Sequence, residues 1–539
     1  MNKVLQLIVT SLYLSLSLPL AANTLLVSQD SVGEMSDTTP VVSSTPTEAP
    51  TDNSSSPENT ANKSSEEEAV ATNPEKMLRF TLQHRFNGGT PLPVETVAIP
   101  TQEIEDRPQI ILESVRQNFS KHLEKQTKPL QIDTEVEFLL PAKATQAIGK
   151  LPKLTLKTYI ESNGSGKSEL VIPADKREIV KPGGDDKARI NWKGLNGHFT
   201  FTDKFESITS QLKFNGLTLE TDKGVSSSSG EINFSGIFDA HFMPSQIDFS
   251  WPSASSKSAD YQSNLQNFIF NFKLEKAPNG LDLGKLNFKI GHWNFTREEK
   301  FILDDFAFTI DNQYLDEVVN FTWQTKIGKL SLPEEIAFNK DSELSYAGEL
   351  VFRRLDADAL LKLQQTVYEL QSQTENPMIF MVLLGKIMEV TPKLLAKSPE
   401  IALNQFNLKT AQGNLQGQGS VRLDGTKATS LEQSVLLSAL QAQAEFSIGK
   451  KLLEQVLDRY VYDTMLEDTE INKEPTEAEL AELHKQARTQ REQRIKGYLE
   501  HKWLVESDDN NYKLVAQLKE GKLTLNGQEV SLPAPPSAK

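Results

Sequence analysis

The segment Gly164-Ser165-Gly166-Lys167-Ser168 has the residue types of a phosphate-binding loop. A P-loop needs a further glycine separated by four residues from its Gly-Lys-Ser, and Glu161 stands at that position. Strand-like sequences flank the segment on both sides, whereas a phosphate loop must open a helix whose N-terminus meets the phosphate. We therefore interpret the segment as a hairpin turn and predict no nucleotide and no other cofactor.

The residue types that could bind a metal or act as nucleophiles are scattered along the sequence. No histidine lies four residues from another, so the spacing of a zinc protease is missing. The adjacent carboxylates Asp304-Asp305 and Asp508-Asp509 are interpreted as solvated turn residues, and no Gly-x-Ser-x-Gly serine-hydrolase motif is present. The sequence thus predicts no metal site and no catalytic residue, and we expect a protein that is not an enzyme. The histidines are His84, His122, His198, His241, His292, His484 and His501.

Phenylalanine is the more informative residue type. The chain has 26 Phe against 10 Tyr and 5 Trp, whereas a transmembrane barrel favours Tyr and Trp at its rims. Phe268, Phe270 and Phe272 alternate with Ile269, Asn271 and Lys273, which is typical of a strand with one apolar face. Core packing is the simpler interpretation of these phenylalanines. The alternative is that Phe268, Phe270 and Phe272 line an apolar groove for lipid or for a partner segment.

The surrounding elements are predicted to be mainly strands. From Leu130 to Phe352, alternating apolar residues separated by turn signals such as Asn279-Gly280 predict antiparallel pairing. We expect an α+β fold, predominantly antiparallel β: a long, meandering, curled sheet with helical insertions over 355–400 and 430–505 and a C-terminal hairpin over 510–530. Additional helices are predicted from Ile104 to Lys125 and, as a buried helix, from Met378 to Val390. Thr476 and Glu479 have the spacing of a capping box.

The N-terminus has the plan of an export signal. Lys3 precedes an apolar run over 4–20, which Ala21 and Ala22 follow. Residues 1–22 are predicted to be a signal peptide or an N-terminal anchor, with an inner-membrane tether through residues 4–22 as the second alternative. Residues 23–76, rich in Ser, Thr, Pro and Glu, are predicted to be a disordered spacer. The body then spans 77–532, and either topology predicts a periplasmic or exported protein.

The composition of the chain argues against a nucleic-acid partner and against chemistry that needs cysteine. The chain has 539 residues and a formal net charge of -16, so it lacks the overall basic character of a nucleic-acid-binding protein. Cys is absent, which excludes disulfides, thiolate nucleophiles and a lipidated N-terminal Cys. We expect no nucleic-acid partner, and stability must come from packing.

Short motifs in three places resemble the YdgA-like family of bacterial envelope proteins, catalogued as domain-of-unknown-function family 945. Their order along the chain is similar to the family's order. The resemblance implies an envelope location and a β-rich fold with helical insertions, and it brings no catalytic residues. Relatives look anchored directly by an N-terminal helix, whereas this chain inserts a long spacer. The motifs are His84-Arg85-Phe86-Asn87-Gly88-Gly89-Thr90-Pro91-Leu92-Pro93, then Pro399-Glu400-Ile401-Ala402-Leu403 with Phe406, Gly413-Asn414-Leu415 and Leu423-Asp424-Gly425, and finally Gly497-Tyr498-Leu499, Tyr512-Lys513-Leu514 and Gly521-Lys522-Leu523-Thr524-Leu525-Asn526-Gly527.

Two function classes follow. The first is a non-catalytic envelope protein that binds or scaffolds, with an envelope protein or a lipid as partner. The alternative is a hydrolase that acts on an envelope polymer through paired carboxylates, since the 73 acidic residues leave such a pair open.

Overall fold

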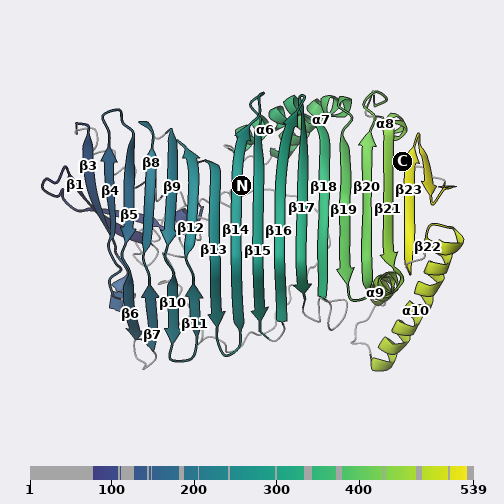
Figure 1. Ribbon diagram of the computed structural model, residues 1–539, viewed down its shortest axis with the longest axis horizontal. Coiled ribbons are helices and arrows are strands. Elements are labelled where there is room, and N and C mark those ends of the chain that lie inside the picture. Colours follow the sequence, from purple (N-terminus) through teal and green to yellow (C-terminus); the bar gives the residue numbers. More distant parts are fainter. Residues whose placement is uncertain are drawn as a thin grey trace, which may run out of the picture. The chain divides into compact units, whose positions relative to one another are not determined.

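A computed structural model describes residues 77–530, with gaps within 107–126, at 181–186, 333–342, 372–378 and 469–475, and at a few shorter positions. The chain divides into two compact units, residues 1–228 and 229–539, which are described separately (Figure 1). The predicted signal peptide and spacer, most of the predicted helix over 104–125, and Asp508-Asp509 lie outside the described residues.

Unit 1 is built of short antiparallel strands. β1 (Met77–Phe86) pairs with β2 (Glu95–Pro100) on one side and with β3 (Leu130–Phe138) on the other. One hydrophobic core cluster of the unit consists of Phe80, Leu82, Ile99 and Ile104. Ile104 belongs to the short helix α3 (Thr101–Asp106). The remaining strands of the unit are β4 (Leu154–Ile160), β5 (Gly166–Ile172), β6 (Asp175–Val180), β7 (Lys187–Trp192), β8 (Leu195–Phe201), β9 (Ser207–Phe214) and β10 (Leu217–Thr221).

The turn between β4 and β5 contains Gly164 and Ser165, and Lys167 and Ser168 lie in β5 itself. The amide of Gly164 donates to the carbonyl oxygen of Glu161, which closes the turn at 3.0 Å. Gly164 has φ +91°, a conformation that other residues rarely adopt. The prediction of a hairpin turn in place of a phosphate loop is confirmed.

Unit 2 is a meander of long antiparallel strands. Each strand from β12 to β20 pairs with the next one along the chain, and β21 pairs with β23. β11 (Ser226–Ser229) crosses the boundary between the units. The strands are β12 (Ile232–Asp239), β13 (Pro244–Lys257), β14 (Gln262–Lys276), β15 (Asp282–Thr296), β16 (Lys300–Leu315), β17 (Val318–Ser331), β18 (Glu343–Asp356), β19 (Glu400–Thr410), β20 (Gly413–Leu423), β21 (Leu440–Gly449), β22 (Val505–Ser507), β23 (Asn511–Lys519), β24 (Lys522–Leu525) and β25 (Gln528–Val530).

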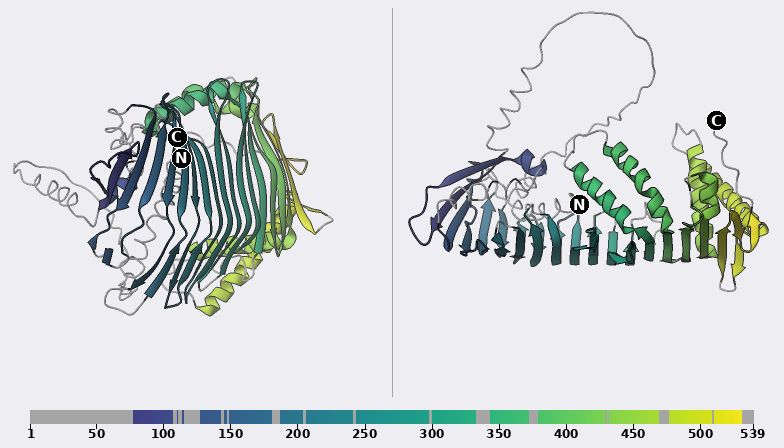
Figure 2. Two further views of the ribbon diagram at one scale, coloured as in Figure 1. Left: turned by 60° about the vertical axis from the view of Figure 1, so that its left-hand side comes forward. Right: turned by 90° about the horizontal axis from the view of Figure 1, so that it is seen from above.

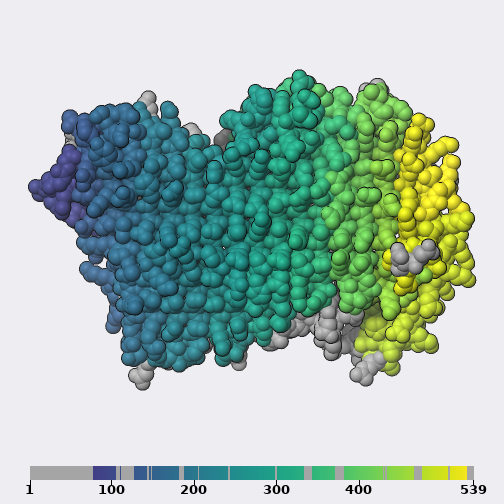
Figure 3. Space-filling view, viewed as in Figure 1, coloured from purple at the N-terminus to yellow at the C-terminus, as the bar shows by residue number. Residues whose placement is uncertain are grey.

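The helices of unit 2 interrupt this meander where the sequence predicts insertions. α6 (Ala357–Gln371) and α7 (Ile379–Ala396) lie between β18 and β19, and α8 (Gln433–Ala439) precedes β21. α9 (Lys450–Asp468) and α10 (Glu477–Glu500) follow β21. When the strands of unit 2 are viewed end-on, α6, α7 and α9 lie on one side of them (Figure 2, right). On the side away from α6 and α7, these strands form a broad continuous surface (Figure 3).

The predicted antiparallel, β-dominated fold with helical insertions and a C-terminal hairpin is confirmed, and the sheet is not closed into a barrel. The capping box is also confirmed, since the amide of Glu479 donates to the Thr476 side chain while the Glu479 carboxylate accepts from the Thr476 amide. None of the helices among the described residues is long and apolar enough to cross a membrane.

The prediction of a buried helix over 378–390 is wrong. Val390 is buried, but Met381 and Met388 are 56% and 60% exposed, and Val382, Leu384 and Ile387 are exposed as well. An all-round apolar sequence predicts burial on every side. In unit 2, α7 packs mainly beside α6, so much of its apolar surface stays open.

Candidate binding face

Phe268, Phe270 and Phe272 lie on one face of β14, and the register carries this face to the neighbouring strands. Phe270 stands opposite Phe249 of β13 on one side and opposite Phe288 of β15 on the other. Residues directly opposite each other in an antiparallel pair point to the same face of the sheet. The three predicted phenylalanines therefore belong to a surface that extends over several strands, which we call the apolar face.

Two rows of directly paired residues on the apolar face can be followed from β13 to β23, and the register shifts of β18–β19 and β19–β20 lie between the two rows. The row through Phe270 contains one threonine and otherwise only apolar residues and glycine, and the row through Phe272 contains only apolar residues and glycine. The Phe270 row consists of Phe249, Phe270, Phe288, Phe308, Thr325, Gly348, Phe406, Gly417, Phe446 and Leu514. The Phe272 row consists of Ile247, Phe272, Leu286, Ile310, Trp323, Leu350, Leu403, Gly419, Ala444 and Ala516.

Aromatic side chains on this face pack edge to face. The ring centroids of Phe249 and Phe268 are 5.6 Å apart, those of Phe268 and Phe288 are 5.1 Å apart, and those of Phe288 and Phe306 are 5.6 Å apart. Interplanar angles of 72–90° give each pair the favourable T-shaped arrangement. The rings thus shield one another laterally, and these contacts stabilise the face.

Two glycines make room for aromatic rings on the same face. A Cβ atom at Gly417 would lie 2.1 Å from Cδ1 of Phe446, and one at Gly348 would lie 2.1 Å from the Tyr346 hydroxyl oxygen. Glycine in mid-strand weakens a sheet unless a neighbouring side chain covers it. Here the rings of Phe446 and Tyr346 lie over the bare backbone, so the glycines are part of the packing.

The apolar face is only partly covered by the described residues. Phe268, Phe270 and Phe272 are half-buried, and Trp323, Ile401 and Val421 are 41%, 49% and 46% exposed. At one end of the strands α6 packs on this face, where Leu360 and Leu361 contact the core around Val319. A broad apolar surface with open side chains of this size is typical of a binding surface.

The opposite face of the same strands, which we call the polar face, carries a chain of hydrogen bonds. Asn271 Nδ2 donates to Asp248 Oδ1 at 2.8 Å, and Asn287 Nδ2 donates to Asn271 Oδ1 at 2.8 Å. Further along the same register, Gln324 Nε2 donates to Glu349 Oε2 at 2.7 Å. The alternation of β side chains places these amides directly behind the apolar rows.

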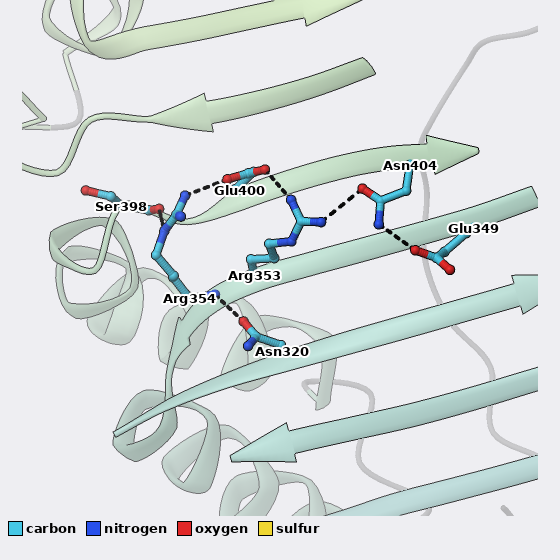
Figure 4. Close-up of polar contacts among 7 residues, drawn as sticks. All are labelled: Asn320, Glu349, Arg353, Arg354, Ser398, Glu400 and Asn404. Carbon is cyan, nitrogen blue, oxygen red and sulfur yellow. Dashed lines mark hydrogen bonds and ion pairs between the residues drawn. The ribbon is translucent and has the colours of Figure 1, made fainter. Parts of the chain in front are cut away.

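The polar chain continues into an arginine–glutamate cluster (Figure 4). Asn404 Nδ2 donates to Glu349 Oε1 at 2.5 Å, and Arg353 Nη2 donates to Asn404 Oδ1 at 2.9 Å. The Glu400 carboxylate accepts from Arg353 at 2.6 Å and from Arg354 at 2.8 Å. Arg354 has φ +56° at the end of β18, and its Nε also donates to the Ser398 carbonyl oxygen.

The carboxylates of this cluster are held in the ionised form. Burial raises the pKa of Glu400, but hydrogen bonds and charge from Arg354 and Arg353 outweigh it, and the net shift is downward. Hydrogen bonds from Asn404 and Gln324 lower the pKa of Glu349. A general acid needs a raised pKa, so neither carboxylate is suited to donate a proton near neutral pH.

Among the described residues no group of His, Asp and Glu side chains has the arrangement of a metal site. The described histidines His84, His198, His292, His484 and His501 do not converge, and His122 and His241 lie outside the described residues. The pair His292 Nδ1 and Asp304 Oδ1, 2.5 Å apart, joins β15 to β16 as cross-strand neighbours. Asp304 and Asp305 lie in β16, and the interpretation of them as turn residues is wrong.

Sequence reasoning named Phe268, Phe270 and Phe272 as a candidate groove and missed how far the apolar face extends across the sheet. Alternation identified Phe268, Phe270 and Phe272, but only the strand register shows that Phe406 and Phe446 continue their row. The arginine cluster was missed because Arg353, Glu400 and Asn404 are distant in the sequence. The adjacent pair Arg353-Arg354 before the helical insertion was the available signal.

Comparison with known proteins identifies the family. The model of the family described as "Bacterial protein of unknown function (DUF945)" matches residues 130–533. The chain belongs to this family. The match includes the apolar face and the arginine cluster and agrees with the resemblance seen in the motifs. No curated protein and no solved structure matches the chain.

Proposed function

We propose that the protein is a non-catalytic binding protein of the bacterial cell envelope, and that the apolar face of unit 2 binds the acyl chains of an envelope lipid. The observation that carries the proposal is the pair of apolar rows from β13 to β23, in which every side chain except that of the buried Ile247 is half-buried or exposed. Burying such surface against an acyl chain is favourable by about 25 cal/mol per Å².

An acyl chain suits this face better than a folded protein partner does. The rows through Phe270 and Phe272 hold one hydroxyl group, that of Thr325, and no charge. A typical protein interface carries about ten hydrogen bonds, which such a surface offers few groups to form. Neighbouring strands lie about 4.8 Å apart, so the rows are long enough for an extended acyl chain lying across them.

Export to the envelope is the second part of the proposal. It rests on the apolar run over 4–20 behind Lys3 and on the spacer composition of 23–76. Alkaline phosphatase, which is active only after export, would be fused behind residue 76. An active fusion supports export, and an inactive fusion that accumulates in the cytoplasm contradicts it.

The binding proposal is tested by native mass spectrometry with lipid extraction on the full chain, produced with its own N-terminal segment in a Gram-negative host. The expected result is a bound species whose extract contains diacyl lipid. A folded chain that carries no lipid, and takes up none from vesicles of phosphatidylethanolamine and phosphatidylglycerol, would contradict the proposal.

A further inference from the structure

The polar face of unit 2 contains a cavity over strands β19, β20, β21 and β23, behind the apolar rows. Its volume is about 560 Å³, within the range of small-ligand sites. Ala402 and Ser420 are directly paired across β19 and β20, and Gln443 and Gln517 follow in the same register. The Arg353–Glu400 pair also lines it.

The lining is rich in side chains that both donate and accept hydrogen bonds. Gln418, Gln443 and Gln517 supply carboxamides, and Ser420 supplies a hydroxyl group. Within the part of the chain that the structure describes, the side chains of Gln443 and Gln517 make no hydrogen bond and are exposed. Their donors and acceptors are therefore available to a ligand.

The charged side chains that line the cavity form ion pairs with other side chains of the protein. Glu400 is paired with Arg353 and Arg354, and Glu445 accepts from Lys513 at 2.6 Å. Asn404 fixes the orientation of Arg353 by accepting from its Nη2. Because each lining charge already has a partner, the cavity offers little attraction to an ionic ligand, and a neutral ligand meets the smaller desolvation cost.

We propose that this cavity binds a neutral saccharide. Each sugar hydroxyl both donates and accepts, which matches carboxamides and a serine better than it matches an apolar or ionic ligand. A peptide added as a strand would need open backbone groups, and β19, β20 and β21 are paired on both sides. The site is separate from the proposed lipid-binding face, since it lies on the other side of the same strands.

The test is calorimetric titration of the full chain with the neutral disaccharide N,N′-diacetylchitobiose. The double variant Gln443→Ala and Gln517→Ala should raise Kd about tenfold, since two neutral hydrogen bonds are lost. The matched control is Gln416→Ala with Gln441→Ala, which removes one exposed and one half-buried carboxamide from the same face of β20 and β21 outside the cavity. The control should change Kd by less than twofold.

Absence of binding by the parent chain at millimolar disaccharide, or equal weakening in both double variants, would overturn the proposal. A variant with Phe270→Glu and Phe272→Glu should bind the disaccharide as the parent chain does. Saccharide binding retained by that variant also shows that its fold is intact, so the two proposals can fail independently.

Discussion

The two faces of the sheet in unit 2 are built from the same strands and differ in the contacts that their side chains make. On the apolar face, Phe268, Phe288 and their neighbours contact one another through rings, and much of that surface stays open. On the polar face, Asn271, Glu349 and Arg353 are joined by hydrogen bonds that run from strand to strand. The apolar face thus keeps open surface for a hydrophobic ligand. On the polar face, most of the side chains named here already have hydrogen-bond partners within the protein, apart from those in the cavity near Gln443.

The largest effect expected on this comparison comes from charging the apolar face. Replacing Phe270→Glu and Phe272→Glu should lower the bound lipid at least tenfold, since a carboxylate next to an acyl chain loses its hydration without gaining a partner. Lipid per protein would be measured by mass spectrometry after extraction.

The matched control for that variant is Lys273→Gln with Lys289→Gln, which changes the net charge equally on the opposite face of β14 and β15. It should keep its lipid. Equal loss of lipid from both variants would assign the effect to net charge and would contradict a specific apolar face.

A smaller effect is expected from the glycine that lies under an aromatic ring. Gly417→Ala places a methyl group where the ring of Phe446 lies, so the ring must move, and we expect a loss of about 1–3 kcal/mol in the free energy of unfolding. Urea unfolding followed by circular dichroism measures the loss. In contrast, Gly497→Ala in α10 meets no atom within 4 Å and should stabilise the protein by up to about 1 kcal/mol. A Gly417→Ala variant as stable as the parent would show that the ring does not pack there.

The Arg353–Glu400 cluster predicts a pH-dependent effect of similar or smaller size. Glu400→Gln leaves two arginines without their carboxylate and should cost about 1–3 kcal/mol at pH 7. Because the pKa of Glu400 is lowered in the folded state, its contribution is present above the pKa of the unfolded chain and is lost as pH falls through the folded value.

The stability difference between the parent chain and Glu400→Gln should therefore shrink as the pH falls below the usual pKa of glutamate. Urea midpoints measured between pH 7 and pH 3 would show this. A difference that does not change with pH would contradict the ionised, paired state of Glu400.

Alternation and turn residues predicted the strand order of the meander because each strand pairs with the next, so local signals suffice. Alternation along the strand also predicted that Phe270 and Asn271 lie on opposite faces of the sheet. The position of the arginine cluster was not predictable, since it depends on how β18 and β19 meet across a helical insertion of the chain. The exposure of α7 was missed because an apolar sequence gives no information on which of its sides finds a partner.

The central claim is that lipid acyl chains contact the apolar face, and site-specific photo-crosslinking tests it most directly. A benzophenone amino acid would replace Phe270 in one full-length chain and Lys289, on the polar face, in another. After irradiation in cells, mass spectrometry of the peptide that contains each position should find a lipid adduct at position 270 and none at position 289. Equal adducts at both positions, or adducts only at position 289, would contradict the account.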